Sequence, residues 1–188
     1  FFMKKSDSIF KESAKELKNT RCITLTAMLA AMSVILSHFT IVVTESLKIS
    51  FFFLPSRIAY YLFGPFVGTI FGATIDILNF FVKPTGPFHP GFTINAALSG
   101  MIFGLILYKK PLKLSRIFVA STINMILVNI ILNTFWIYTI IGNAIIASIP
   151  IRIIKNIALL PFESIFLFLV IKSIDATGVF KLLKQNNR

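Results

Sequence analysis

Long apolar segments separated by short polar ones constrain this chain more than any other feature of its sequence. Hydrophobic residues make up 56% of the 188 residues, and charged residues only 14%. A soluble domain carries about 25% charged residues, so the composition disfavours a soluble protein with a very apolar core. Because roughly 20 helical residues cross a bilayer core about 30 Å thick, the segments predict membrane-spanning helices.

Six of these segments read as spans, although the second is short. The Gly64–Pro65 turn between the second and third is so tight that these two must form a hairpin. We therefore predict an all-α integral membrane protein, a bundle of six transmembrane helices. The spans are expected at Cys22–Phe39, Ile49–Phe63, Phe66–Val82, Phe92–Tyr108, Ile117–Ile140 and Ile149–Ser173.

Basic residues indicate how this bundle lies in the membrane. They gather before the first span, between the fourth and fifth, and after the sixth, all on one side. Cytoplasmic loops carry an excess of Lys and Arg, so both termini are predicted to be cytoplasmic. The net charge of +12 then reflects topology. Nucleic acid is rejected as a partner because the basic residues follow no single helix face.

The predicted topology divides the chain into three parts. Residues 1–21 form a cytoplasmic amphipathic segment, expected along the membrane surface with Phe10 and Leu17 facing lipid. Residues 22–173 form the six-helix transmembrane domain, and residues 174–188 form a cytoplasmic tail.

The last apolar segment carries Arg152, Lys155 and Asn156 at its start and Glu163 about halfway along. Ionisable groups are costly in hydrocarbon and usually face a protein interior or a water-filled cavity. Snorkelling to the outer surface is the alternative for the two cations, and the scarcity of cations on that side disfavours it. These residues therefore predict a binding site inside the membrane protein.

Amides and aromatic rings gather in the same outer third of the bundle. The spacing of Asn129, Asn133 and Trp136 puts them on one helical face. An interfacial aromatic belt is the alternative for Trp136. With Phe88, Phe92 and Asn95, this set suits a planar, hydrogen-bonding, anionic molecule that enters from outside.

Two further ionisable residues fall inside the predicted hairpin. Arg57 lies in the middle of the second span and Asp76 in the third, about one helical turn beyond the level of Arg57. We expect Arg57 to pair with Asp76 or with Glu163, as a structural ion pair and not as a ligand site.

Small residues spaced four apart allow helices to approach closely. Ala27 and Ala31 form such a pair in the first span, and glycine stripes in the third and fourth spans are expected to pack this chain's own helices. Motifs for a P-loop, a zincin and a nucleophile elbow are absent from the sequence. We therefore expect neither an enzyme nor a chain with its own ATPase site, and no cofactor or metal site.

Two strings of residues resemble a known family. The stretch from Phe88 to Gly100 resembles the third loop and fourth helix of the folate-specific substrate-binding subunit of bacterial energy-coupling-factor (ECF) transporters. Arg152-Ile153-Ile154-Lys155-Asn156, followed by Leu160-Pro161-Phe162-Glu163, is similar to that family's sixth helix. The Ala27/Ala31 pair matches the family's alanine docking motif. The likeness extends from Thr20 to Ser173.

The resemblance implies a six-helix, multi-pass protein of the bacterial cell membrane that captures a vitamin from outside. Such a subunit joins a transmembrane coupling protein and two cytoplasmic ATPases, and Ala27 and Ala31 would dock on the coupling protein.

For folate, the resemblance and the helix positions suggest three groups of contacts. Asn95, Asn133 and Asn156 would read polar edges. Phe88, Phe92 and Trp136 would stack on the rings, and Arg152 and Lys155 would meet negative charge or an acceptor edge. A subunit for riboflavin or thiamine, and a small membrane channel, remain as alternatives.

Overall fold

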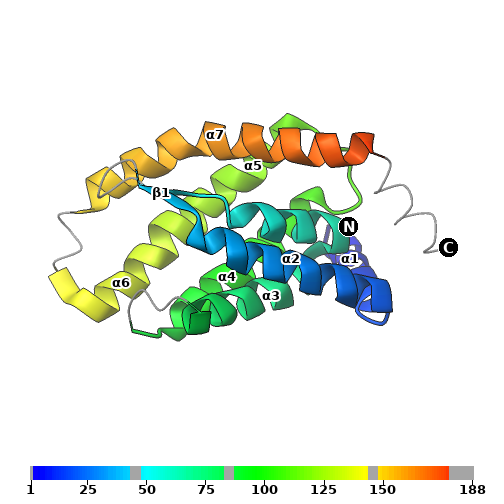
Figure 1. Ribbon diagram of the computed structural model, residues 1–188, viewed down its shortest axis with the longest axis horizontal. Coiled ribbons are helices and arrows are strands. Elements are labelled where there is room, and N and C mark those ends of the chain that lie inside the picture. The colour runs from blue at the N-terminus through cyan, green and yellow to red at the C-terminus, as the bar shows by residue number, and fades with distance from the viewer. Residues whose placement is uncertain (1, 43–47, 83–86, 144–147, 178–188) are drawn as a thin grey trace.

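The protein is a bundle of helices that mostly run along its long axis (Figure 1). The computed structural model describes residues 2–42, 48–82, 87–143 and 148–177. Five helical stretches in these ranges are long and apolar enough to cross a membrane by length and composition. They are α2 (Thr20–His38), α3 (Phe53–Val82), α4 (Pro90–Leu107), the stretch Leu114–Ile140, and α7 (Ile149–Ala176).

The helix α3 is broken at Gly64, whose φ of 84° and ψ of −170° are not helical. Such a positive φ favours glycine, and Pro65 suits the first position of the helix that follows. The chain folds back at this point, because the ring of Tyr60 lies 6.1 Å from that of Phe71, centroid to centroid. The turn thus lies where the sequence predicts it.

The second half of α3 packs against α4 through small residues. A Cβ added to Gly72 would collide with the carbonyl of Ala96, and one added to Gly100 would collide with the carbonyl of Gly68. The two backbones are therefore in direct contact, which is the close approach that small-residue spacing permits.

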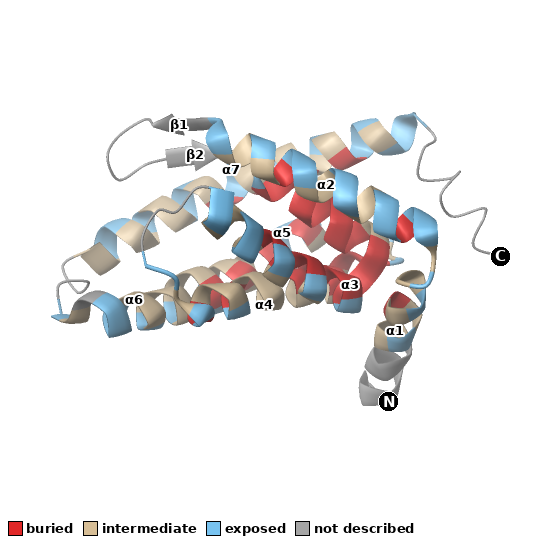
Figure 2. Ribbon diagram, turned by 60° about the horizontal axis from the view of Figure 1, so that its bottom comes forward, coloured by how far each residue is buried: buried red, intermediate tan, exposed pale blue. Residues whose placement is uncertain are grey.

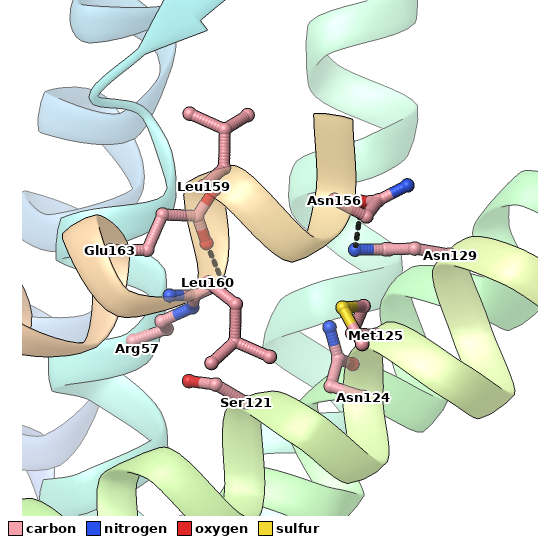
Figure 3. A pocket seen from close by; sticks show the side chains of 9 residues that line it. All are labelled: Arg57, Ser121, Asn124, Met125, Asn129, Asn156, Leu159, Leu160 and Glu163. Atoms are coloured by element: carbon pink, nitrogen blue, oxygen red, sulfur yellow. Dashed lines mark hydrogen bonds and ion pairs between the residues drawn. The ribbon is translucent and has the colours of Figure 1, made fainter. Parts of the chain in front are cut away.

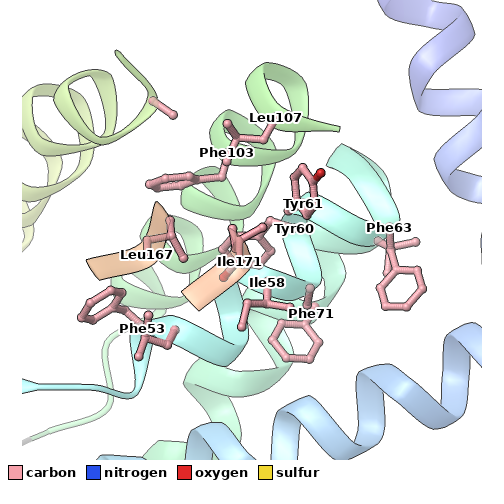
Figure 4. Packing of buried hydrophobic residues seen from close by; sticks show 14 of the residues in the cluster. Phe53, Ile58, Tyr60, Tyr61, Phe63, Phe71, Phe103, Leu107, Leu167 and Ile171 are labelled. Atoms are coloured by element: carbon pink, nitrogen blue, oxygen red, sulfur yellow. The ribbon is translucent and has the colours of Figure 1, made fainter. Parts of the chain in front are cut away.

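Apolar side chains from α3, α4 and α7 form the core (Figure 4). Phe103, Leu167 and Ile171 are almost fully buried there. Buried residues concentrate on α3 and its neighbours, whereas the outward faces of the other helices are exposed (Figure 2). Many large apolar side chains lie on those exposed faces, including Phe81 and Ile154, as expected for a protein surrounded by lipid.

A serine of α1 (Phe2–Glu16) caps the second half of α3. Ser13 Oγ accepts hydrogen bonds from the backbone N–H groups of Phe66 and Val67, both at 3.1 Å, and donates to the Phe63 carbonyl at 2.6 Å. An N-cap side chain normally supplies these bonds from within the helix, and here Gly64 has no side chain to offer. The expectation that Leu17 faces lipid was wrong, because Leu17 packs against the core.

Two elements differ from the all-α prediction. The strand β1 (Thr40–Val42) pairs antiparallel with β2 (Lys48–Ser50), so α3 begins at Phe53 and not at Ile49. A backbone that pairs with a second strand satisfies its polar groups outside a helix, and this pairing lies mostly between the first two predicted spans.

The predicted fifth span is not a uniform α-helix. It consists of α5 (Leu114–Asn124), the π-helical segment η1 (Met125–Leu132) and α6 (Asn133–Ile141). The backbone angles at the two junctions stay helical, so the three form one run. Of the predicted tail, residues 178–188 lie outside the described residues.

Candidate functional site

A pocket lies between α3, α5, η1 and α7, and polar side chains dominate it (Figure 3). Its volume is about 20 Å³, which is little more than the space that one water molecule occupies. It is lined by Arg57, Ser121, Asn124, Met125, Asn129, Asn156, Leu159, Leu160 and Glu163.

Arg57 is buried at one end of this pocket. Its Nη2 atom lies 2.6 Å from Oε2 of Glu163. The guanidinium also lies 4.4 Å from the ring centroid of Phe53 and 4.8 Å from that of Phe103, distances typical of cation–π contacts. Its Nη1 atom is buried and has no hydrogen-bond partner among the described residues.

Arg57 thus contacts Glu163, one of the two partners considered for it. Asp76, the other candidate, accepts a hydrogen bond of 2.8 Å from Thr93 Oγ1. Within the described ranges no ion pair involves Asp76. The carboxylate of Asp76 therefore ties α3 to α4, while Arg57 ties α3 to α7.

Amide groups continue the polar lining away from Arg57. Asn129 Nδ2 donates to Asn156 Oδ1 at 3.4 Å, and Asn156 Nδ2 donates to the Arg152 carbonyl at 2.9 Å. Asn124 Oδ1 accepts a hydrogen bond of 2.6 Å from Ser99. One turn before Asn156, the Nη1 atom of Arg152 is buried and lacks a partner in the described part of the chain.

A second cluster forms around Trp136, where α6 meets the start of α4. Trp136 Nε1 donates to Asn95 Oδ1 at 3.1 Å. The ring of His89 lies 5.4 Å from that of Trp136 and 5.8 Å from that of Phe92. Gly91 lets the indole approach the backbone, since a Cβ there would overlap the ring.

The predicted ligand-binding residues therefore divide between two places. Asn156 lines the pocket, while Phe92, Asn95 and Trp136 gather in the second cluster. The remaining four do not line the pocket: Phe88 packs on Phe80 with ring centroids 5.0 Å apart, and Asn133, Arg152 and Lys155 are half-buried.

The π-helical segment explains part of this division. α-Helical spacing puts Asn129, Asn133 and Trp136 on one face, yet Asn129 bonds to α7 and Trp136 bonds to α4. A π-helix has more residues per turn than an α-helix, so η1 rotates the residues after it relative to those before it. It also brings Asn124 and Asn129, which are five residues apart, into one pocket.

Sequence reasoning missed Ser121 and His89 as parts of these clusters. Ser121 Oγ is buried in the pocket and has no hydrogen-bond partner in the ranges that the structure covers. A lone serine in an apolar helix carries no signal by itself. His89 is the N-cap of α4, directly before Pro90, and its contact with Trp136 depends on packing between α4 and α6.

Ala27 and Ala31 are both exposed on α2. Around them, the large apolar side chains of Met28, Met32 and Ile35 are more than half exposed. The exposed face of α2 is therefore apolar around the alanine pair.

Comparison with known proteins identifies the family to which this chain belongs. Residues 21–171 match the sequence profile of the family described as "ECF transporter, substrate-specific component". The chain belongs to this family. The match spans every helix from α2 to most of α7, and so includes both polar clusters and the exposed alanine pair.

Two named proteins are similar to this chain over most of its length. The chain is 27% identical over 172 residues to "Folate transporter FolT" of Clostridium novyi (strain NT), covering 92% of this chain and all of that protein. It is 32% identical over 152 residues to the protein of the same name from Leuconostoc mesenteroides subsp. mesenteroides, covering 77% and 81% of the two chains.

A solved structure also resembles this one. The match is to a structure titled "Crystal structure of FolT bound with folic acid", with 34% sequence identity and a TM-score of 0.71. It covers 81% of this chain and 93% of that chain. The bundle fold is therefore shared over most of both proteins, as expected for ECF substrate-specific components.

Proposed function

We propose that this chain captures folate from outside the cell as the substrate-binding subunit of an ECF transporter. The carrying observation is the likeness to the folic-acid-bound FolT structure over 93% of that chain. Membership of the substrate-specific component family and the two FolT relatives support the same ligand.

The site chemistry supports this ligand class. Folate combines a flat pterin, an aminobenzoate and a glutamate with carboxylates. We assign Asn95, Asn133 and Asn156 to its polar edges, and the rings of Phe88, Phe92 and Trp136 to stacking. Arg152 and Lys155 then meet negative charge or an acceptor edge. The buried Nη1 of Arg152, which has no partner in the described ranges, supports its part.

The small volume of the pocket adds a condition to this proposal. A space of about 20 Å³ cannot hold a vitamin, so this pocket can form only part of the folate site, which is larger when the ligand is bound. We assign the pocket and the Trp136 cluster to this one larger site.

The topology that we propose has six membrane crossings with both termini in the cytoplasm. The break at Gly64 divides α3 into two halves that fold back on each other, which supports counting α3 as two spans. The basic residues before α2 and after α4 support the orientation. The protein is then a multi-pass protein of the bacterial cell membrane.

The transport partners in this proposal are a transmembrane coupling protein and two cytoplasmic ATPases. The exposure of Ala27 and Ala31 on an apolar face of α2 supports docking of the coupling protein there. ATP hydrolysis by the two ATPases then drives uptake, and this subunit captures the vitamin and delivers it to the coupling module.

Titration of the purified protein with folate, riboflavin and thiamine tests the ligand assignment. We expect tight binding of folate and no comparable heat from the other two vitamins. Preferential binding of riboflavin or thiamine would instead identify the chain as the substrate-binding subunit for that vitamin. Passive solute flux through liposomes that lack ATPases would instead support a channel.

A further inference from the structure

Two buried polar groups in the pocket lack partners within the described part of the chain, and they come from different helices. They are Nη1 of Arg57 on α3 and Oγ of Ser121 on α5. Both residues are more than nine-tenths buried, with 8% and 5% exposure. Figure 3 shows the Ser121 hydroxyl turned toward the Arg57 side of the pocket.

Leaving such groups unpaired is unfavourable. A buried donor or acceptor without a partner costs about 1–3 kcal/mol, and more when it is charged. Proteins therefore seldom keep two in one pocket without a reason. A bound molecule with a hydrogen-bond acceptor for Arg57 and a polar atom for Ser121 would satisfy both groups.

The geometry around Arg57 holds its guanidinium in place for such a contact. Glu163 binds Nη2, and the rings of Phe53 and Phe103 both contact the guanidinium. These contacts hold the guanidinium in place, and Nη1 is a buried donor without a partner in the described part of the chain. A donor held in advance loses little conformational entropy when a ligand binds.

Charge decides which kind of ligand group suits this end of the pocket. Arg57 and Glu163 together are neutral, so a carboxylate placed beside them would meet an opposing carboxylate. A neutral heterocycle with a carbonyl acceptor avoids that repulsion. The cations Arg152 and Lys155 lie 11 and 8 residues before Glu163, about 16 and 12 Å along a helix, and they suit an anionic tail.

We infer that Arg57 and Ser121 bind the carbonyl edge of the pterin of folate at the deep end of the pocket, with the glutamate tail toward the start of α7. This inference rests on the proposed function and adds to it. It changes the expected role of Arg57 from a purely structural ion pair to a specificity-determining ligand contact that Glu163 positions.

Calorimetry on the purified full chain tests the inference with two ligands, folate and the analogue whose pterin 4-carbonyl is replaced by an amino group. A charge-assisted hydrogen bond to the carbonyl predicts that the unmodified protein binds folate about tenfold more tightly than the amino analogue. Replacing both charges in Arg57→Met/Glu163→Met should bring the two affinities close to each other.

A serine pair provides a test that does not disturb the ion pair. Ser121→Ala should weaken folate binding about fivefold, the worth of one hydrogen bond. Ser164→Ala is the matched control, because Ser164 is also a buried serine without a partner in the described ranges but does not line the pocket. We expect it to leave folate affinity unchanged.

The outcomes separate the inference from the proposed function. If the unmodified protein does not bind folate, both are wrong. If it binds folate but shows no preference over the amino analogue, or if Ser121→Ala matches Ser164→Ala, the inference alone is overturned. Should the double variant fail to fold, the serine pair and the analogue ratio of the unmodified protein still decide.

Discussion

Arg57 and Glu163 are 106 residues apart in the chain, yet their side chains meet at 2.6 Å and join α3 to α7. The arginine is the more deeply buried partner, with 10% of its side chain exposed against 28% for the glutamate. The contact closes one end of the pocket, so its loss would affect both the stability of the bundle and the shape of the site.

Glu163→Gln should destabilise the protein because it leaves the buried guanidinium of Arg57 without a countercharge. Breaking a buried ion pair costs about 3–5 kcal/mol, and the partial exposure of Glu163 reduces the expected loss to about 2 kcal/mol. Thermal unfolding in detergent measures it. Glu12→Gln is the control, because the Lys109–Glu12 pair is about half exposed and should contribute less than about 1 kcal/mol. Equal losses in the two variants would contradict the prediction.

Ser13→Ala should also destabilise the protein, by about 1–2 kcal/mol, because the N–H groups of Phe66 and Val67 lose their acceptor. Limited proteolysis should cleave α1 faster, since Ser13 anchors that helix to the turn at Gly64. Ser115→Ala, at an exposed serine, should change neither stability nor cleavage. An unchanged melting temperature in Ser13→Ala would show that water replaces the cap without loss.

Gly91→Ala should displace Trp136, because the added methyl group would overlap the indole. Trp136 is the chain's only tryptophan, so its intrinsic fluorescence reports this change directly. We expect a shifted emission maximum and several-fold weaker folate binding. Ile94→Ala changes a lipid-exposed residue of the same helix and should alter neither. A shifted emission maximum together with normal folate affinity would exclude the Trp136 cluster from the binding site.

Arg152→Ala and Lys155→Ala should each weaken folate binding about tenfold, the worth of one charge-assisted contact. Calorimetry at two salt concentrations measures the affinity and its electrostatic part. Lys113→Ala serves as the control, because Lys113 is exposed before α5 and does not line the pocket. Unchanged folate affinity in both variants would refute their part in binding.

Ala27→Trp and Ala31→Trp should block uptake and leave folate binding intact. An indole projecting from the exposed face of α2 would prevent close approach of a partner helix. The measurements are uptake in cells that carry the complete transporter and calorimetry on the isolated subunit. Val119→Trp, at a residue that is 51% exposed on α5, should retain uptake. Loss of binding in the alanine variants would assign those residues to the fold or the site.

Much of the bundle could be predicted because lipid imposes a simple rule on sequence. The Gly64–Pro65 turn could be predicted from the sequence, since glycine accepts a positive φ and proline suits the first position of a helix. The strands β1 and β2 were not predicted, because most of their residues fall between the first two predicted spans, where a connecting loop was expected, and only Ile49 and Ser50 fall at the start of the second span. The π-helical segment η1 could not be predicted, because its residues suit an α-helix equally well.

The candidate site was less predictable because it depends on contacts between distant helices. Spacing along the hairpin pointed from Arg57 to Asp76 as readily as to Glu163, and only packing of α7 against α3 brings the glutamate within reach. Ser13 of α1 caps the second half of α3, and nothing in the sequence near either segment indicates this contact. Ser121 is a candidate because its hydroxyl is buried and has no partner in the described residues, a property that depends on the packed structure and not on the sequence.

The glycine contacts between α3 and α4 constrain how the molecule can change shape. Where backbone touches backbone, there are no side-chain rotamers to absorb a sliding motion. The second half of α3 and α4 must therefore travel as one stiff block, with Asp76 and Thr93 acting as a brace between them. Any widening that admits a vitamin has to come from the opposite wall, where amides and long side chains between η1 and α7 can yield.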